Sequence, residues 1–262
     1  MSHFFDVAVT RDLARSMERC ELTFIDRHAI DHQRAAAQHE RYCERLVALG
    51  LEVIRLPADE AQPDCCFIED TAVVLDEVAV ITCLGSPARR GETPAVEREL
   101  SKHRPIARIE WPATLDGGDV LVVGRTILVG STTRTNAAGI EALRGITAPF
   151  GYELTVLRVP GCLHLKSAVT ALDDETLLAN RGLVELEPVK QQYRVVDVDV
   201  GEPGAANVLR VRDEVWAHPG YPRTFEKLQG LGVHVVGVDI SEFVKAEGAL
   251  TCKSLLLRKP SA

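Results

Sequence analysis

The sequence lacks several features that would place it at a membrane or on a polyanion. No apolar run among its 262 residues approaches the roughly 18 residues that a transmembrane helix needs. The first residues lack the basic segment and apolar stretch of a secretory signal peptide. The net charge of −8 argues against nucleic acid or an anionic membrane as a partner. We therefore expect a cytoplasmic protein.

Signatures of cofactors and cross-links are also missing. The seven cysteines are an odd number and form no Cys-x-x-Cys pair, which argues against a disulfide framework or a structural zinc site. The sequence contains no phosphate-binding glycine loop, dinucleotide fingerprint or His-Glu-x-x-His pattern. We expect no cofactor and no metal. Because no linker or low-complexity segment divides the chain, we also expect residues 1–262 to form a single domain.

The clearest positive signal is a repeat of about 40 to 50 residues. A small polar residue, an apolar run, a short polar turn and a second apolar run follow one another four times. The copies begin at Asp70, Asp119, Ser167 and Asn207, which lie 49, 48 and 40 residues apart (119 − 70, 167 − 119, 207 − 167). Each copy is typical of a β-hairpin, since its runs are rich in Val, Leu and Ile and are bounded by turn residues.

Helices and further strands are predicted between the hairpins. The apolar spacing and end signals predict helices over 31–49, 93–103 and 222–231, and strands over 52–56, 155–159 and 233–238. A unit of hairpin, helix and strand repeated about five times fits a closed ring of α/β blades better than an open stack. In such a ring the four residues that begin the hairpins would meet at one central pocket.

Two residues could form a nucleophile and its base. Cys252 lies just before the last apolar run, beside Lys253, a cation that could lower the pKa of the thiol. His164 alternates with two leucines, which predicts a strand that turns the imidazole away from them. Each residue alone also fits a plain structural role, the cysteine as a small buried side chain and the histidine as a core or surface residue. A single cysteine with a remote histidine is nevertheless a candidate catalytic pair.

Carboxylates and arginines supply candidates for binding. Acids precede the first two hairpins at 69–70 and 116–119, where they could be turn residues or could line a pocket for a planar cation. Gly117 and Gly118 would allow the backbone to approach a ligand closely. Arg89 and Arg134 lie in loops before helices, where each is either a solvated charge or a clamp for a carboxylate.

Seven motifs in one order carry a resemblance to a known family. They are Asp-Cys-Cys-Phe-Ile-Glu-Asp-Thr at 64–71, Ser-Pro-Ala-Arg-Arg-Gly-Glu-Thr at 86–93, Leu-Asp-Gly-Gly-Asp at 115–119, Arg-Thr-Asn at 134–136, Leu-His-Leu-Lys-Ser at 163–167, Gly-Tyr-Pro-Arg-Thr at 220–224 and Leu-Thr-Cys-Lys-Ser at 250–254. Over nearly the whole chain, from about residue 15 to 257, the sequence resembles the dimethylarginine dimethylaminohydrolases of the guanidino-group-modifying superfamily. The segment 20–31, which the family uses as a mobile lid, matches only around residues 22–23.

The resemblance implies an α/β fold, a five-bladed pseudo-symmetric propeller with a central active-site pocket. It also implies hydrolysis of Nω-methylated L-arginine to citrulline and methylamine or dimethylamine, without a cofactor. Matched position by position, Cys252 is the nucleophile and His164 the general acid/base. Asp116 either holds the guanidinium group or orients His164. The small-molecule substrate is the expected partner, and a homodimer is a further possibility.

The resemblance further implies a set of substrate contacts. Glu69 and Asp70 would meet the guanidinium group, and Phe67 falls in the same motif. Asp64 would receive the α-amino group, Arg89 and Arg134 the α-carboxylate, and Leu22 and Ala246 would offer main-chain carbonyls. Two other readings stay open: an arginine deiminase or amidinotransferase of the same superfamily, and a non-catalytic methylarginine-binding protein. The short chain has no room for the extra helical domain of most deiminases, and mere binding needs neither the cysteine nor the histidine.

Overall fold

A computed structural model describes residues 5–259 and contains five small sheets of three strands each. The sheets are β15 (Leu255–Leu257), β1 (Val7–Arg11) and β2 (Glu52–Leu56); β3 (Ala72–Val74), β4 (Ala79–Ile81) and β5 (Ile106–Arg108); β6 (Val120–Val123), β7 (Thr126–Ser131) and β8 (Glu153–Arg158); β9 (Val169–Ala171), β10 (Thr176–Ala179) and β11 (Arg194–Asp197); and β12 (Leu209–Val211), β13 (Glu214–Ala217) and β14 (Val235–Gly237). In each sheet an antiparallel pair is extended by a parallel outer strand.

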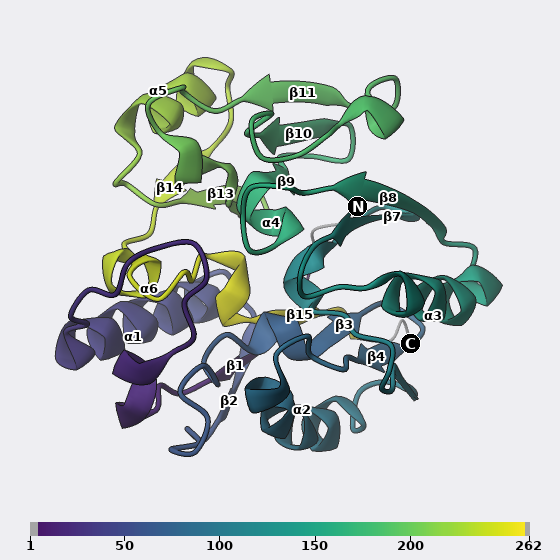
Figure 1. Ribbon diagram of the computed structural model, residues 1–262. Helices are drawn as coiled ribbons and strands as arrows, with labels where there is room; N and C mark the ends of the chain where they lie inside the picture. The colour runs from purple at the N-terminus through teal and green to yellow at the C-terminus, as the bar shows by residue number, and fades with distance from the viewer. Residues whose placement is uncertain (1–4, 260–262) are drawn as a thin grey trace.

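The crossover to each parallel strand runs along the outside of the ring (Figure 1). Four crossovers contain a helix: α1 (His32–Ala48), α2 (Thr93–Leu100), α3 (Ala137–Thr147) and α5 (Pro222–Gly230). The remaining crossover, between β10 and β11, has only the 3-10 turn η6 (Glu187–Val189). Two shorter helices are α4 (Leu165–Ala168), near the centre of the ring, and α6 (Ser241–Val244). The repeat therefore predicted the α/β propeller correctly, and the two ends of the chain close it, since β1 pairs with β15.

Local sequence explains where the helices begin and end. The Asp31 carboxylate accepts a hydrogen bond from the Arg34 N–H at 3.0 Å and caps α1. Gly50 follows α1 with a φ of +83°, the left-handed conformation that suits a residue without a Cβ atom. Helix α2 starts at Thr93, expected as its N-cap, because the 3-10 turn η3 (Pro87–Glu92) leads directly into it.

The apolar core is distributed between neighbouring sheets and the helices outside them. Leu128 and Leu157 of one sheet pack in one cluster with Val169 and Leu177 of the next. Buried faces of this kind leave only the inner ends of the sheets free to present polar side chains at the ring axis. Within residues 5–259 no helix combines the length and the apolar character required to cross a membrane.

A short helical turn precedes the first strand of every sheet and leads toward the axis. These five turns are η2 (Ile68–Thr71), η4 (Gly117–Asp119), α4, η7 (Pro203–Ala206) and η8 (Thr251–Lys253). Adjacent turns contact one another: Gly118 donates its N–H to Asp70 at 3.1 Å, and the Leu165 N–H donates to Asp119 at 2.9 Å. The turns therefore bring residues from distant parts of the sequence to the ring axis.

Gly117 permits this packing of turns, and its replacement is a test of the fold. A Cβ atom there would lie 2.0 Å from the carbonyl oxygen of Glu69, which is rigid backbone. We expect Gly117→Ala to lower the free energy of unfolding by more than about 2 kcal/mol in urea denaturation. Gly145→Ala is the matched control, since nothing lies within 4 Å of its added methyl group. The control should be neutral or about 0.5–1 kcal/mol more stable, because alanine favours a helix. Equal stability of both variants would contradict this packing.

Candidate active site

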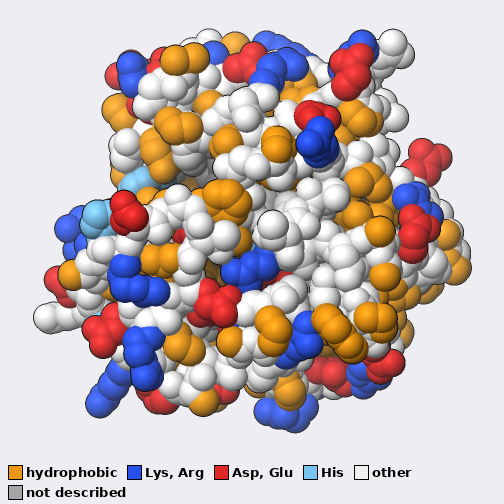
Figure 2. Space-filling view, in the orientation of Figure 1, with side chains coloured by type: hydrophobic (Ala, Val, Ile, Leu, Met, Phe, Trp, Pro, Cys, Tyr) orange, Lys and Arg blue, Asp and Glu red, His pale blue; other side chains and the backbone are white. Residues whose placement is uncertain are grey.

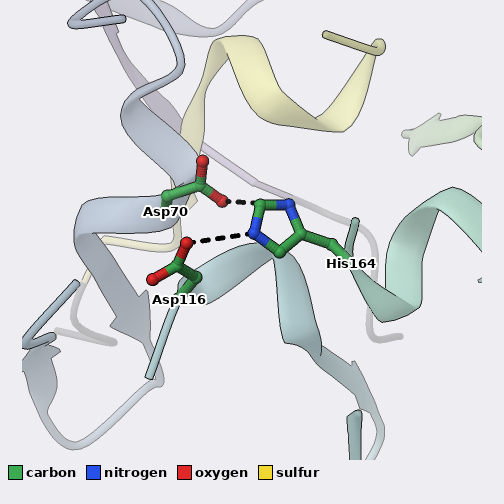
Figure 3. A group of neighbouring side chains, drawn as sticks. All are labelled: Asp70, Asp116 and His164. Atoms are coloured by element: carbon green, nitrogen blue, oxygen red, sulfur yellow. Dashed lines mark hydrogen bonds and ion pairs between the residues drawn. The ribbon is translucent and has the colours of Figure 1, made fainter. Parts of the chain in front are cut away.

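His164 lies between two buried carboxylates at the ring axis (Figure 3). Its Nε2 is 3.0 Å from an Asp116 oxygen, and its Nδ1 is 3.7 Å from Asp70. His164 is not inside a strand, as the alternation with leucines predicted, but is the N-cap residue of α4 with an extended backbone. The second Asp116 oxygen accepts the Gly85 N–H at 2.8 Å, so Asp116 is fixed and orients the imidazole ring.

The two carboxylates make His164 a stronger base than an ordinary histidine. Burial alone would lower the pKa of the imidazole, but the negative charges of Asp70, Asp116 and Asp119 outweigh it and raise the pKa to about 9. At neutral pH the ring is therefore an imidazolium. The effect is mutual. Burial alone would raise the pKa of the Asp70 carboxyl, but the positive charges of His164 and Arg89 outweigh it and hold that pKa below its ordinary value.

Cys252 lies in η8 and lines the same small cavity as His164 and Asp70. Burial, together with the charges of Glu69 and Asp70, raises the pKa of the thiol to about 12. Without a ligand the sulfur is therefore protonated and unreactive. A cation placed beside it would shift the thiol toward the thiolate, because opposite charges a few Å apart favour ionisation.

Lys253 does not activate the thiol, although it is the next residue in the sequence and was assigned no role from it. Its ammonium group points away from the cavity and lies 3.2 Å from the centre of the Phe243 ring and 3.0 Å from His39 Nδ1. Burial lowers the pKa of this lysine to about 7. The cation that lowers the pKa of Cys252 is Lys166, which is weaker in effect than the carboxylates that raise it. Successive side chains of a 3-10 turn point in different directions, so Cys252 and Lys253 are neighbours in the sequence but face different surroundings.

One cavity gathers most of the residues predicted for the site. It has a volume of about 310 Å³, including its opening to solvent. Its lining includes the predicted residues Asp64, Phe67, Asp70, Arg89, Arg134, His164, Ala246 and Cys252. On the face shown in Figure 2, basic and acidic side chains lie next to one another near the centre of the ring.

Three predicted residues lie elsewhere. Asp116 is fully buried behind His164 and does not line the cavity. Leu22 is half-buried and packs against the core beside α1. Glu69 turns into a separate cavity, where it binds the Lys166 ammonium group and accepts the Thr251 hydroxyl at 2.7 Å. Of the acidic pair Glu69 and Asp70, only Asp70 lines the cavity with Cys252 and His164, and Glu69 acts on Cys252 through its charge.

The same cavity is also lined by the two predicted arginines and Asp64. Arg89 donates two hydrogen bonds to Glu92, one to Asp70 at 2.7 Å and one to the Phe67 carbonyl, so one of its five N–H groups is left. Arg134 donates to the Glu21 carboxylate at 3.1 Å. Asp64 is buried and accepts the Glu21 N–H at 3.2 Å.

Sequence reasoning missed two acidic residues that line the cavity, Glu21 and Glu247. Glu247 has a φ of +54°, and its carboxylate accepts the N–H groups of Thr23 and Phe24 at 2.6 Å each. It thereby fastens residues 23–24, close to Glu21 in the lining of the cavity. No motif marks either residue, and the two lie more than 220 positions apart, so only the fold could bring them together.

The same three side chains shown in Figure 3 offer ligand atoms within 4.8 Å of one another. Asp70, Asp116 and His164 could in principle surround a small cation. Since the atoms concerned already form the carboxylate–imidazole contacts, such an ion would compete with the proton on His164. The arrangement therefore serves acid–base chemistry better than metal binding.

Comparisons with known proteins agree with this geometry. No family model matches the chain. Two curated relatives are N(G),N(G)-dimethylarginine dimethylaminohydrolases: one from Streptomyces coelicolor, 41% identical over 91% of this chain and 92% of the relative, and one from Pseudomonas aeruginosa, 36% identical over 86% and 89%. The chain belongs to the dimethylarginine dimethylaminohydrolase family.

Solved structures share this fold. A cysteine-to-serine mutant of the Pseudomonas aeruginosa dimethylarginine dimethylaminohydrolase, complexed with citrulline, has a TM-score of 0.90 at 33% identity and covers 97% of this chain and 100% of its own. A histidine-to-glycine variant of a dimethylarginine dimethylaminohydrolase, solved as an adduct with S-methyl-L-thiocitrulline, has a TM-score of 0.91 at 34% identity, with the same coverage. The N-terminal domain of the arginine dihydrolase ArgZ, at 18% identity and a TM-score of 0.83, shares the fold.

Proposed function

We propose that this chain hydrolyses Nω-methylated L-arginine to L-citrulline and methylamine or dimethylamine, with residues 1–262 acting as one catalytic domain. One observation carries the proposal: Cys252, His164 and Asp70 line one small cavity together with Asp64, Arg89 and Arg134. A guanidinium group and an α-amino acid need complementary charges at opposite ends of such a cavity. The citrulline and thiocitrulline complexes of the related enzymes support the same reading.

Substrate binding starts the reaction. The Asp70 carboxylate receives the guanidinium group and holds its central carbon near the Cys252 sulfur, and orientation of this kind supplies on the order of several kcal/mol of the barrier. The substrate cation also lowers the pKa of the thiol from its resting value of about 12. The enzyme therefore forms its nucleophile only when a cationic substrate is present, and the resting thiol is protected from side reactions.

His164 moves the protons. The thiolate attacks the guanidinium carbon, the C–N bond to the methylated nitrogen breaks, and the imidazolium gives its proton to the departing amine. Asp116 occupies Nε2, so Nδ1 is the ring nitrogen left for this transfer. An S-alkylthiouronium group remains on Cys252. The neutral imidazole then takes a proton from water, the oxygen bonds to the same carbon, and the C–S bond breaks to release citrulline.

The remaining predicted residues take positions in this scheme. Asp64 would accept the α-amino group, and Arg134 with the last N–H of Arg89 would bind the α-carboxylate. Ala246 lines the cavity and would offer its carbonyl, as would Leu22 from the segment above it. A homodimer stays a prediction that analytical ultracentrifugation would test.

Citrulline release by the purified protein tests the function directly. Asymmetric dimethylarginine, monomethylarginine and arginine are compared in parallel, with Cys252→Ser as the blank. We expect turnover of both methylated substrates, and the parallel assay with arginine ranks the three, since small apolar contacts discriminate by only about 1–3 kcal/mol. Turnover of arginine alone would make the chain an arginine deiminase, and tight binding without turnover would make it a binding protein.

A further inference from the structure

The carboxylate of Glu21 binds Arg134, the arginine that the proposed function assigns to the substrate α-carboxylate. One Glu21 oxygen accepts a hydrogen bond from Arg134 at 3.1 Å, and the other accepts the Ser86 hydroxyl at 2.7 Å. The Arg134 side chain is only 11% exposed, so few other partners can reach it. Glu21 thus places a carboxylate where an amino acid substrate must place its own.

The position of Glu21 is fixed from several sides. Its own N–H donates to Asp64 at 3.2 Å. The N–H groups of Thr23 and Phe24, just after it in the chain, donate to Glu247 at 2.6 Å each. Thr23 adds a hydroxyl 3.4 Å from Arg134. The contact with Arg134 is therefore built by a whole segment and not by one flexible side chain.

The charge balance of the cavity makes this contact consequential. Arg89 is already neutralised by Glu92 and Asp70, with which it forms three of its four hydrogen bonds. Once Glu21 pairs with Arg134, each of the two arginines that line the cavity already has a carboxylate partner. Asp64 lines the same cavity and repels a second negative charge, while it still attracts an amine.

We propose that Glu21 competes with the substrate α-carboxylate for Arg134 and so shifts the specificity of the site toward guanidines and ureas that lack a carboxylate. This inference rests on the proposed function. Arg134 donates one hydrogen bond to Glu21 and one to Thr23, so a ligand carboxylate must either share the guanidinium group with the Glu21 carboxylate, which repels it, or displace Glu21. Either route reduces the affinity for an amino acid ligand. A decarboxylated ligand keeps the amine contact with Asp64 and leaves the pair intact.

Calorimetric binding tests the competition without any need for turnover. In the Cys252→Ser background, L-citrulline and its decarboxylated analogue N-carbamoylputrescine are titrated with and without Glu21→Gln. We expect Glu21→Gln to tighten citrulline binding by about fivefold, the size of one partly exposed ion pair, and to change binding of the analogue by less than about twofold. The exposed carboxylate of Asp26 in the same segment supplies the control Asp26→Asn, which should leave the ratio of the two affinities unchanged.

A double-mutant cycle separates competition from a general loosening of the segment. With Arg134→Gln present, Glu21→Gln should no longer tighten citrulline binding, because the pair it relieves is gone. An equal change for both ligands, weaker citrulline binding in Glu21→Gln, or no citrulline binding in any variant would overturn the proposal. Failure of the proposed function would instead appear as absence of turnover of methylated arginines by the unmodified enzyme, whatever the binding ratio.

Discussion

Replacing Cys252 with serine should reduce turnover of asymmetric dimethylarginine by at least about 10⁴-fold, because loss of a nucleophile removes the covalent route altogether. A serine hydroxyl has nearly the same size but does not ionise in this pocket. Binding of citrulline should change by less than about threefold, since Asp70 and the other residues that line the cavity are untouched. Steady-state citrulline release and calorimetry measure the two quantities.

Cys83→Ser is the matched control for that variant. Cys83 is also a free, half-buried cysteine, but it packs against a different part of the core and does not line the cavity. The control should keep its activity within about threefold. If Cys252→Ser kept comparable activity, the reaction would not pass through this sulfur.

The second large effect concerns His164 and the pH dependence of catalysis. His164→Gln should lower kcat by about 10³-fold, because glutamine can still bond Asp116 but cannot transfer a proton. In the unmodified enzyme the pKa of His164 is about 9, above its ordinary value. The acid form is therefore complete at neutral pH and is lost as pH rises through about 9, so kcat/KM should fall on that alkaline side.

Asp116→Asn tests the origin of this alkaline limb. Asp116 is one of the charges that raise the pKa of His164, so its removal should move the limb to lower pH while some activity remains. Profiles of kcat/KM between about pH 6 and 10.5 would reveal the shift. A limb at the same pH in both proteins would mean that another group, and not His164, is the acid.

The propeller could be predicted because each repeat is recognisable from short stretches of the sequence. Apolar runs of three to six residues and their turns marked four hairpins, and the spacing of Asp70, Asp119, Ser167 and Asn207 predicted that their inner ends meet. The structure bears this out in part: neighbouring turns meet, since Asn207 hydrogen-bonds with Thr251 and Asp70 with Gly118, but of the four residues only Asp70 lines the cavity that holds Cys252 and His164. The pairing of β1 with β15 was not predicted, because the two strands lie at opposite ends of the sequence.

The site was harder to predict wherever a side chain could interact with more than one partner. Gly117 and Gly118 were expected to admit a ligand, but they admit the backbone of Glu69 and the side chains of Asp70 and His164. The sequence motif placed Glu69 at the guanidinium end, yet Lys166 draws it into the next cavity. Such outcomes depend on which charges the fold brings together, and neighbours in sequence do not reveal this.

The central claim is that Cys252 forms a covalent bond to the guanidinium carbon. Mass spectrometry of the enzyme trapped during turnover tests this claim most directly. The enzyme is mixed with asymmetric dimethylarginine, quenched in acid while turnover proceeds, and digested to locate any added mass. The account predicts an adduct on the peptide containing Cys252, heavier by the mass of the substrate less that of dimethylamine, and none in Cys252→Ser. Rapid turnover with no adduct at any quench time, or an adduct on another cysteine, would contradict it.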